Sequence, residues 1–249
     1  MQVRKIQIVM GMPITVEIVD CPSEELLEAV FAYFAAIDRR FSLYKPGSEI
    51  TALNQGRLAA KTASPEMQEV LAIADDIKYR THGYFDVRRP NGLVDPSGVV
   101  KGWAVRNAAR LIEVARSGNY YVDAGGDIQS NGTAADGADW RIGIQHPFNE
   151  REIVKVVCPR GRGIATSGTY VRGQHIYDPH RPARSIGDII SLTVIGADVL
   201  QADLYATAAF AMGKPGIYFI EQLPGFEGYM IDCAGIATQT TGFKDFVVS

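Results

Sequence analysis

The uneven distribution of helix-like and strand-like segments limits the fold of this 249-residue chain more than any other feature. Apolar residues and helix-capping signals in the first half predict three helices, over residues 23–41, 64–82 and about 98–116. The second half is dominated by short strand-like runs, from "NYYVDAGG" to "IATQTT", with one further helix predicted over 198–212. Strands and helices do not alternate regularly, as they would in a doubly wound parallel sheet. The order therefore predicts an α+β fold with mixed or antiparallel sheets.

Local signals at both ends of the chain predict hairpins. Near the start, "RKIQIV" and "ITVEIV" read as two strands joined by "MGMP". Near the end, "GYMIDCAGIATQTTGF" reads as a terminal hairpin with Gly235 close to the turn. The sequence contains no internal repeat, low-complexity tract or obvious linker, so we expect a single domain over residues 1–249.

The composition excludes several classes of partner. With 47% hydrophobic residues, 21% charged residues and a net charge of −3, the chain is not suited to general binding of nucleic acid or anionic membranes. Its three cysteines (Cys21, Cys158 and Cys233) form no CxxC pair, which suits a reducing compartment. No apolar run approaches the roughly 18 residues of a membrane span. We therefore expect no membrane span and a cytoplasmic protein, unless a leader has been removed.

The stretch "DPSGVVKGWAV", residues 95–105, raises the question of phosphate binding. It fails the P-loop pattern, because Trp103 stands where a hydroxyl is needed, and it fails the dinucleotide fingerprint as well. Gly98 nevertheless lies where backbone could approach a ligand at a helix start, and Lys101 adds a positive charge suited to phosphate. Taken alone, the stretch fits a capped helix with an exposed lysine at least as well.

A carboxylate on an apolar helix is the second candidate feature. Asp203 and Thr207 are four residues apart within "QADLYATAAFAMG", so their oxygens share one helix face. One carboxylate, one hydroxyl and a few carbonyl or phosphate oxygens suit Mg²⁺ that arrives with a nucleotide. The alternative is a structural role in which Asp203 pairs with an arginine or with backbone N–H groups. Both interpretations stay open at this point.

Two further stretches carry weaker signals. His175 precedes Asp178 by three residues, a spacing that would allow the carboxylate to lie behind the imidazole, but Asp-Pro is itself a turn former. In "DAGGDI", residues 123–128, two adjacent glycines follow a strand, which is typical of a close backbone approach. Asp127 in this stretch would serve either a site or the turn.

The order of these motifs resembles that of the ApbE-type FAD:protein FMN transferases. The similarity covers about Met10 to Gly213 and is carried by "MGMPITVEI", "RRFSLYKPGSEITALNQG", "GYFDV", "VDPSGVVKGWAV", "YVDAGGDI", "WRIGIQHP", "ATSGTYVRGQHIYDP" and "ADLYATAAFAMG". The resemblance implies a single-domain α+β fold related to the T-fold, with FAD in a cleft.

The resemblance also implies a reaction. With Mg²⁺, the FAD pyrophosphate is cleaved, AMP leaves, and FMN is joined by a phosphoester to a Thr or Ser hydroxyl of an acceptor flavoprotein. Two other readings remain open: an FAD pyrophosphatase that releases FMN and AMP, and an FAD-binding or storage protein without turnover. The identity of the acceptor and the oligomeric state stay undetermined.

Site residues follow from the same resemblance, position by position. The implied FAD contacts are Met10, Tyr44, Tyr84, Phe85, Asp86, Asp95, Lys101 and Ile176. The implied metal ligands are Asp203, Thr207 and the backbone carbonyls of Gly98 and Ala206. His175 matches the base that accepts the proton of the attacking hydroxyl, and Asp178 is retained with it. The chain departs from the family pattern "HIxDPxTG", because "HIYDPHRPAR" lacks the Thr-Gly pair.

Overall fold

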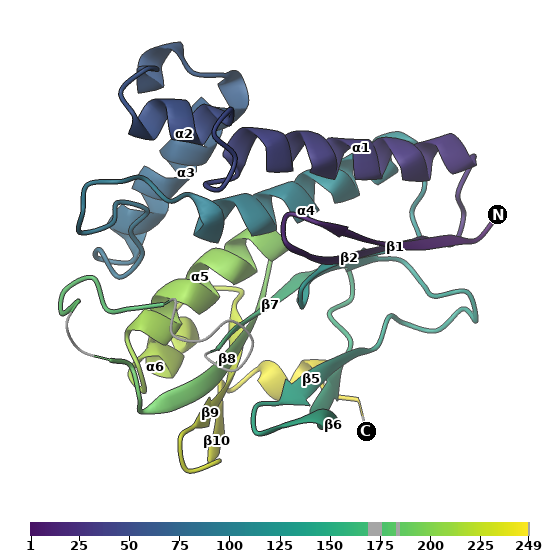
Figure 1. Ribbon diagram of the computed structural model, residues 1–249. Helices are drawn as coiled ribbons and strands as arrows, with labels where there is room; N and C mark the ends of the chain where they lie inside the picture. Colours follow the sequence, from purple (N-terminus) through teal and green to yellow (C-terminus); the bar gives the residue numbers. More distant parts are fainter. Residues whose placement is uncertain (169–175, 183–184, 249) are drawn as a thin grey trace.

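The computed structural model describes residues 1–168, 176–182 and 185–248 (Figure 1). The helices are α1 (Glu24–Phe41), α2 (Glu49–Asn54), α3 (Pro65–Arg80), α4 (Ser97–Val114), α5 (Val199–Ala211) and α6 (Gly216–Glu221), with short 3-10 turns η1 (Ala60–Thr62) and η2 (Phe243–Phe246). The strands are β1 (Val3–Val9), β2 (Met12–Ile18), β3 (Tyr120–Ala124), β4 (Asp127–Asn131), β5 (Ile142–His146), β6 (Asn149–Val157), β7 (Gly163–Gly168), β8 (Ile189–Gly196), β9 (Glu227–Asp232) and β10 (Ala237–Gln239).

The four predicted helices are confirmed, with ends close to those expected. Two of them begin at the predicted caps: the Ser64 hydroxyl accepts from the Met67 N–H, and the Asp198 carboxylate accepts from the Gln201 N–H. The short helices α2 and α6 were not predicted. Each is six residues long, which is too short to show a periodic apolar pattern.

The strands form an eight-stranded sheet in the order β1-β2-β3-β4-β7-β8-β9-β10 and a separate β5-β6 hairpin. Every described strand pair is antiparallel, so the predicted α+β class with antiparallel sheets is confirmed. Both terminal hairpins are present, β1-β2 and β9-β10. The β3-β4 hairpin turns at Gly125 and Gly126, which have φ of 61° and 93°. Glycine tolerates that left-handed backbone without steric cost.

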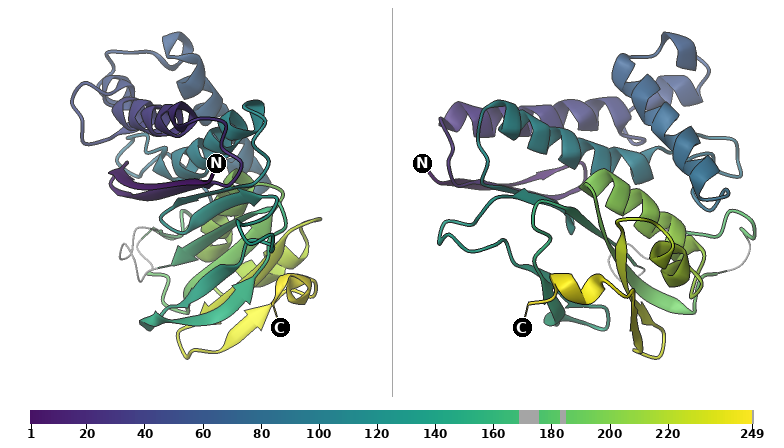
Figure 2. Two further views of the ribbon diagram at one scale, coloured as in Figure 1. Left: turned by 90° about the vertical axis from the view of Figure 1, so that its right-hand side faces the viewer. Right: turned by 180° about the vertical axis from the view of Figure 1, so that it is seen from behind.

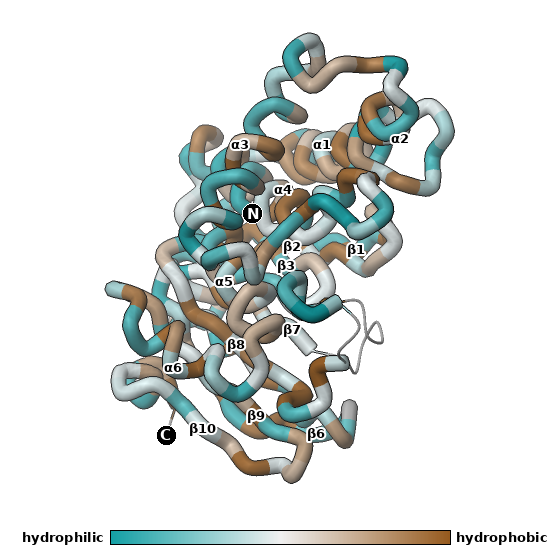
Figure 3. The backbone as a smooth tube through the Cα atoms, turned by 90° about the vertical axis from the view of Figure 1, so that its left-hand side faces the viewer, coloured by the Kyte–Doolittle hydropathy of each residue, from teal (hydrophilic) through white to brown (hydrophobic). Residues whose placement is uncertain are grey.

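An apolar cluster lies on each face of the large sheet, and Figure 2 shows the long helices gathered on one side of it. On one face, α1, α4 and α5 pack against it around the larger buried cluster, which includes Phe34, Trp103 and Phe210. On the other face, β5, β6 and η2 cover a smaller cluster that includes Ile144, Ile164 and Phe243. Figure 3 shows apolar stretches along α1 and β8, where the helices meet the sheet.

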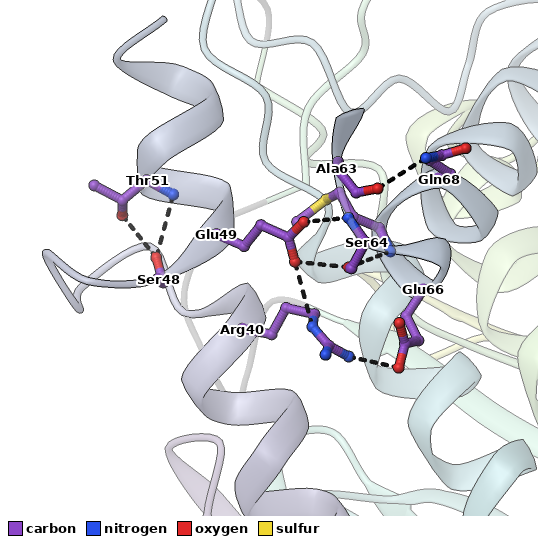
Figure 4. A network of polar contacts seen from close by, with 9 residues as sticks. Arg40, Ser48, Glu49, Thr51, Ala63, Ser64, Glu66 and Gln68 are labelled. Carbon is purple, nitrogen blue, oxygen red and sulfur yellow. Dashed lines mark hydrogen bonds and ion pairs between the residues drawn. The ribbon is translucent and has the colours of Figure 1, made fainter. Parts of the chain in front are cut away.

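A polar network joins the C-terminal end of α1 to α2 and α3 (Figure 4). The Arg40 guanidinium lies 3.3 Å from the Glu49 carboxylate and 2.8 Å from that of Glu66. Glu49 also accepts from the Ser64 hydroxyl at 2.7 Å, and Ser64 in turn caps α3. The Glu49 carboxylate thus joins the start of α2 to the start of α3. The segment that follows α3 forms one wall of the cleft described below.

Helices α4 and α5 approach closely at Gly102. A Cβ atom at this position would lie 2.9 Å from the Leu200 Cα and 3.1 Å from the Asp203 Cβ. Only a residue without a side chain allows this contact, so the sequence brings the N-terminal half of α4 against the acidic residue of α5.

Among the described residues, no helix combines the length and hydropathy needed to cross a bilayer.

Candidate active site

A cleft of about 1240 Å³ opens between the large sheet, the β5-β6 hairpin and the N-terminal end of α4. Its walls also include the segments 84–91 and 176–182, which follow α3 and precede β8. Pockets for drug-sized ligands usually measure roughly 300–1,000 Å³. The cleft is therefore large enough for a ligand of dinucleotide size.

At the inner end of the cleft, α4, α5 and β4 bring one lysine and two carboxylates together. The Lys101 Nζ lies 2.5 Å from the Asp127 Oδ2 and 3.7 Å from the Asp203 Oδ1. Asp127 is fully buried and Asp203 is 3% exposed. The Asp127 side chain therefore pairs with Lys101 behind the cleft and does not line the cleft itself.

The cluster places two buried carboxyl groups beside one ammonium. Burial raises the pKa of Asp203, the nearby charge of Asp127 raises it further, and the Lys101 ammonium opposes the shift. A side-chain hydrogen bond between Asp127 and Asp203 also raises the pKa of Asp203. Two neighbouring buried carboxylates are costly to keep ionised together, and a cation beside Asp203 would lower that cost.

The Asp203 carboxylate is hydrogen-bonded to the backbone of α4. Gly102 donates its N–H to the Asp203 Oδ2 at 3.2 Å. An ideal α-helix directs the same N–H at the carbonyl four residues earlier, which is that of Gly98. One turn beyond Asp203, the Thr207 hydroxyl lies 3.4 Å from the Ser167 hydroxyl of β7. Asp203, Thr207 and Gly98 all line the cleft, whereas Ala206 is buried within α5 and does not.

These oxygen donors fit a hard divalent cation. Carboxylate, hydroxyl and carbonyl oxygens are the ligands that Mg²⁺ takes, and Mg²⁺ is usually completed by water and substrate phosphates. The residues that the structure describes contain no cluster of three or more His, Cys, Asp or Glu side chains suited to a metal ion. Because substrate phosphates usually complete the coordination of Mg²⁺, this donor set suits a cation that binds together with a phosphate-bearing ligand.

Three predicted FAD contacts lie in the turn after α3 and line the cleft: Tyr84, Phe85 and Asp86. The Phe85 ring is buried and packs against Gly98, where a Cβ atom would lie 3.3 Å from it. Asp86 pairs with Lys78 at 2.6 Å. The aromatic wall is thus packed directly on the first turn of α4.

Asp95 and Ile176 also line the cleft. Asp95 lies just before α4, and Ile176 lies in the segment 176–182. The Asp95 carboxylate pairs with Arg89 and accepts from the Ser97 N–H at 3.1 Å, so it holds the approach to α4. Ile176 is partly buried and packs against the larger apolar cluster.

Two predicted flavin contacts, Met10 and Tyr44, do not line the cleft. Met10 lies in the β1-β2 turn with φ of 57° and packs against the larger cluster, while its neighbours Gly11 and Met12 line the cleft. Tyr44 is 95% exposed beyond the end of α1 and does not line it. A flavin contact at either residue stays a prediction that the observed placement does not support.

The predicted base and its carboxylate have different outcomes. His175 lies outside the described residues. Asp178 does not line the cleft, and its carboxylate accepts from the His180 backbone N–H at 2.9 Å. This contact is the turn chemistry that the Asp-Pro sequence allows. A catalytic role for Asp178 therefore has no geometric support among the described contacts.

Sequence reasoning missed other polar residues of the cleft, among them Tyr121, Asp123 and Arg141. The Asp123 carboxylate accepts from the Gly126 N–H at 2.8 Å and from the Tyr121 hydroxyl at 3.1 Å. Burial raises the pKa of Asp123, and these two hydrogen bonds oppose the shift. The signal was present in "VDAGGD", where two carboxylates flank a pair of glycines at the end of a strand.

The fold and the cleft together define a protein with room for a large ligand beside buried carboxyl groups suited to a cation. Comparison with known proteins names the group to which it belongs. The sequence profile of the ApbE family matches residues 10–90 and 87–230. The chain is therefore a member of the ApbE family.

Several proteins of that family are similar to the chain. The FAD:protein FMN transferase of Escherichia coli K12 is 32% identical over 178 residues, which cover 67% of this chain and 51% of that protein. The FAD:protein FMN transferase of Salmonella typhimurium LT2 is 31% identical over 180 residues, which cover 68% of this chain and 51% of that protein. The chain thus spans about half the length of the curated relatives it matches.

Solved structures support the fold. The flavin transferase ApbE of Vibrio cholerae superposes with a TM-score of 0.86 at 24% identity, over 99% of both chains. The ApbE protein of Thermotoga maritima gives a TM-score of 0.86 at 19% identity, over 100% of both. At these identities the likeness shows the fold alone.

Proposed function

We propose that this protein transfers FMN from FAD to a Thr or Ser hydroxyl of an acceptor flavoprotein and releases AMP. The observation that carries the proposal is the meeting of Gly98, Lys101, Asp203 and Thr207 at the inner end of one large cleft. These residues come from two helices about one hundred positions apart in sequence. The names of the similar proteins of Escherichia coli and Salmonella typhimurium support the same reaction.

In the proposed reaction, the acceptor hydroxyl oxygen forms a bond to the phosphorus of the FMN half of FAD. The bond from that phosphorus to the bridging oxygen breaks, and AMP leaves with the bridging oxygen. The proton of the hydroxyl passes to a base, for which His175 is our proposal. Phosphoryl transfer of this kind depends on positioning and on positive charge near the phosphate oxygens.

The chain's own residues divide between ligand and cation. Tyr84, Phe85 and Ile176 offer apolar and aromatic surface for the large ring systems of FAD. Asp203, Thr207 and the Gly98 and Ala206 carbonyls are the residues that would hold Mg²⁺, of which the first three groups lie at the cleft. When bound, Mg²⁺ would supply positive charge to the phosphate oxygens.

A direct assay tests this proposal. The protein is incubated with FAD and Mg²⁺, alone, with an acceptor flavoprotein that carries a Thr or Ser flavinylation site, and with the same acceptor in which that residue is replaced by Ala. AMP is followed by chromatography and protein-bound flavin by in-gel fluorescence. We expect AMP and bound flavin only with the intact acceptor.

The other outcomes separate the competing readings. AMP that appears at the same rate without acceptor would identify an FAD pyrophosphatase, because water then takes the place of the hydroxyl. Binding of FAD with no AMP under any condition would identify a storage protein. Either result would contradict the transferase proposal.

A further inference from the structure

Lys101 occupies the position between the two carboxylates at the inner end of the cleft. Its ammonium lies 2.5 Å from the Asp127 Oδ2 and 3.7 Å from the Asp203 Oδ1, and its side chain is only 16% exposed. Asp127 approaches from β4 and Asp203 from α5, so the lysine on α4 bridges three elements. The ammonium is the positive charge that the structure shows in contact with both carboxylates.

One of those two carboxylates is also the side chain that we propose as the metal ligand. A divalent cation and an ammonium that share a carboxylate repel one another, and the repulsion is strong where the groups are partly shielded from water. The full attraction between the cation and the Asp203 carboxylate is therefore available only if the Lys101 ammonium moves away from that carboxylate. Asp127 lies behind Lys101 and does not line the cleft.

We infer that Lys101 is the resident counter-ion of the carboxylate pair in the metal-free protein, so that a divalent cation must compete with its ammonium for Asp203. The inference rests on the metal site of the proposed function. It gives Lys101 a role beyond contact with FAD, because its charge sets the affinity of the empty protein for the metal.

The competition has a consequence for the order of binding. A pyrophosphate in the cleft offers the ammonium an anionic partner in place of Asp203. A ligand with a pyrophosphate thus lowers the cost of metal binding, and by linkage the metal favours that ligand to the same extent. The Lys101 ammonium thus stays beside the carboxylate pair until a nucleotide and a metal are both present.

The test measures metal binding in the full-length protein without nucleotide. Mn²⁺ prefers the same oxygen ligands as Mg²⁺ and is followed by electron paramagnetic resonance. Lys101→Gln removes the charge but keeps an N–H donor for Asp127, and we expect it to bind Mn²⁺ about tenfold more tightly than the wild type. Lys214→Gln is the matched control, because Lys214 forms a Lys–Asp pair of 2.7 Å with Asp232 outside the cleft. We expect no change there.

A second variant covers the case in which Lys101→Gln does not fold. Lys101→Arg keeps the charge and adds bidentate hydrogen bonding to carboxylates, so it should bind Mn²⁺ several-fold more weakly than the wild type. ADP at roughly 1 mM serves as the pyrophosphate probe. The inference predicts that ADP tightens Mn²⁺ binding more in the wild type than in Lys101→Gln.

The outcomes separate this inference from the proposed function. Equal or weaker Mn²⁺ binding by Lys101→Gln, with Asp203→Ala showing that the signal comes from this site, would overturn the role of Lys101 and leave the transferase proposal intact. Loss of FMN transfer in the assay above, with the Mn²⁺ pattern as expected, would overturn the transferase proposal and leave the competition intact. Absence of Mn²⁺ binding by every variant would overturn the metal site and the inference together.

Discussion

Asp203 is an acidic residue on a helix that is otherwise almost entirely apolar, and its contacts explain how the fold accommodates it. The Gly102 N–H and the Lys101 ammonium both approach its carboxylate, from α4. The sequence alone left a metal and a structural pair as alternatives. The observed partners are a backbone N–H and a lysine, and the same lysine contacts a second buried carboxyl group, that of Asp127.

At the same scale, Asp203→Asn tests the role of the charge with little change in shape. We expect AMP release with FAD and acceptor to fall by at least ~100-fold, because the variant loses the anionic oxygen nearest the proposed metal. FAD binding, followed by flavin fluorescence, should be largely retained, since the aromatic wall is untouched. Asp198→Asn on the same helix is the matched control, because asparagine also caps helices. Unchanged turnover in Asp203→Asn would contradict the metal assignment.

At the scale of elements, the close contact between α4 and α5 determines where the site residues meet. Gly102→Ala places a methyl group 2.9 Å from the Leu200 Cα, so the helices must separate. We expect a loss of about 1–3 kcal/mol in the free energy of unfolding by urea, together with a lower rate of AMP release. Gly47→Ala is the control, since a Cβ atom there has no neighbour within 4 Å. A Gly102→Ala protein as stable and active as the control would contradict this account.

The two walls of the cleft are joined at His180. Its Nε2 lies 2.9 Å from the His82 carbonyl, and its ring packs edge-on against Tyr84 at 4.6 Å between centroids. This contact links the segment 176–182, which lacks the Thr-Gly pair common in the family, to the aromatic segment after α3. The His180 side chain thus connects the two walls.

We therefore predict that His180→Ala weakens FAD binding without abolishing turnover. Loss of one hydrogen bond and one ring contact should raise the KM for FAD roughly two- to tenfold, with a smaller change in kcat. His180→Gln keeps a side-chain N–H donor and should recover most of the affinity. A KM unchanged in the alanine variant, or no recovery with glutamine, would show that this contact does not position the wall.

Elements were more predictable from sequence than contacts between them. Helices α1, α3, α4 and α5 repeat their apolar residues over several turns, so their limits could be read within about two residues. Tyr44 and Met10 show the opposite case, because the position of a turn residue relative to a cleft depends on packing far away in sequence. The pairing of Lys101 with Asp127 likewise requires α4 to cross β4, which no local pattern encodes.

At the scale of the whole molecule, the two apolar clusters share their strands. Neighbouring residues of one strand contribute to opposite clusters, as Ile164 and Ala165 do in β7 and Val194 and Ile195 do in β8. Side chains alternate between the two faces of a strand, so the sheet is buried on both sides. Loss of either layer would expose apolar surface of the same strands, which supports the prediction of a single domain.

That prediction is testable because each cluster has its own tryptophan. Trp103 is buried in the larger cluster, and Trp140 packs against Tyr121 at the edge of the smaller one. In Trp103→Phe, fluorescence reports the smaller cluster while far-ultraviolet circular dichroism reports mainly the helices around the larger. We expect the two urea transitions of this variant to coincide in midpoint and slope, because shared strands make unfolding cooperative. Trp140→Phe is the control, in which both signals report the larger cluster and should coincide whether or not the smaller cluster unfolds separately. A fluorescence transition that precedes the circular dichroism transition only in Trp103→Phe would show that β5, β6 and the C-terminal turn unfold as a separate unit.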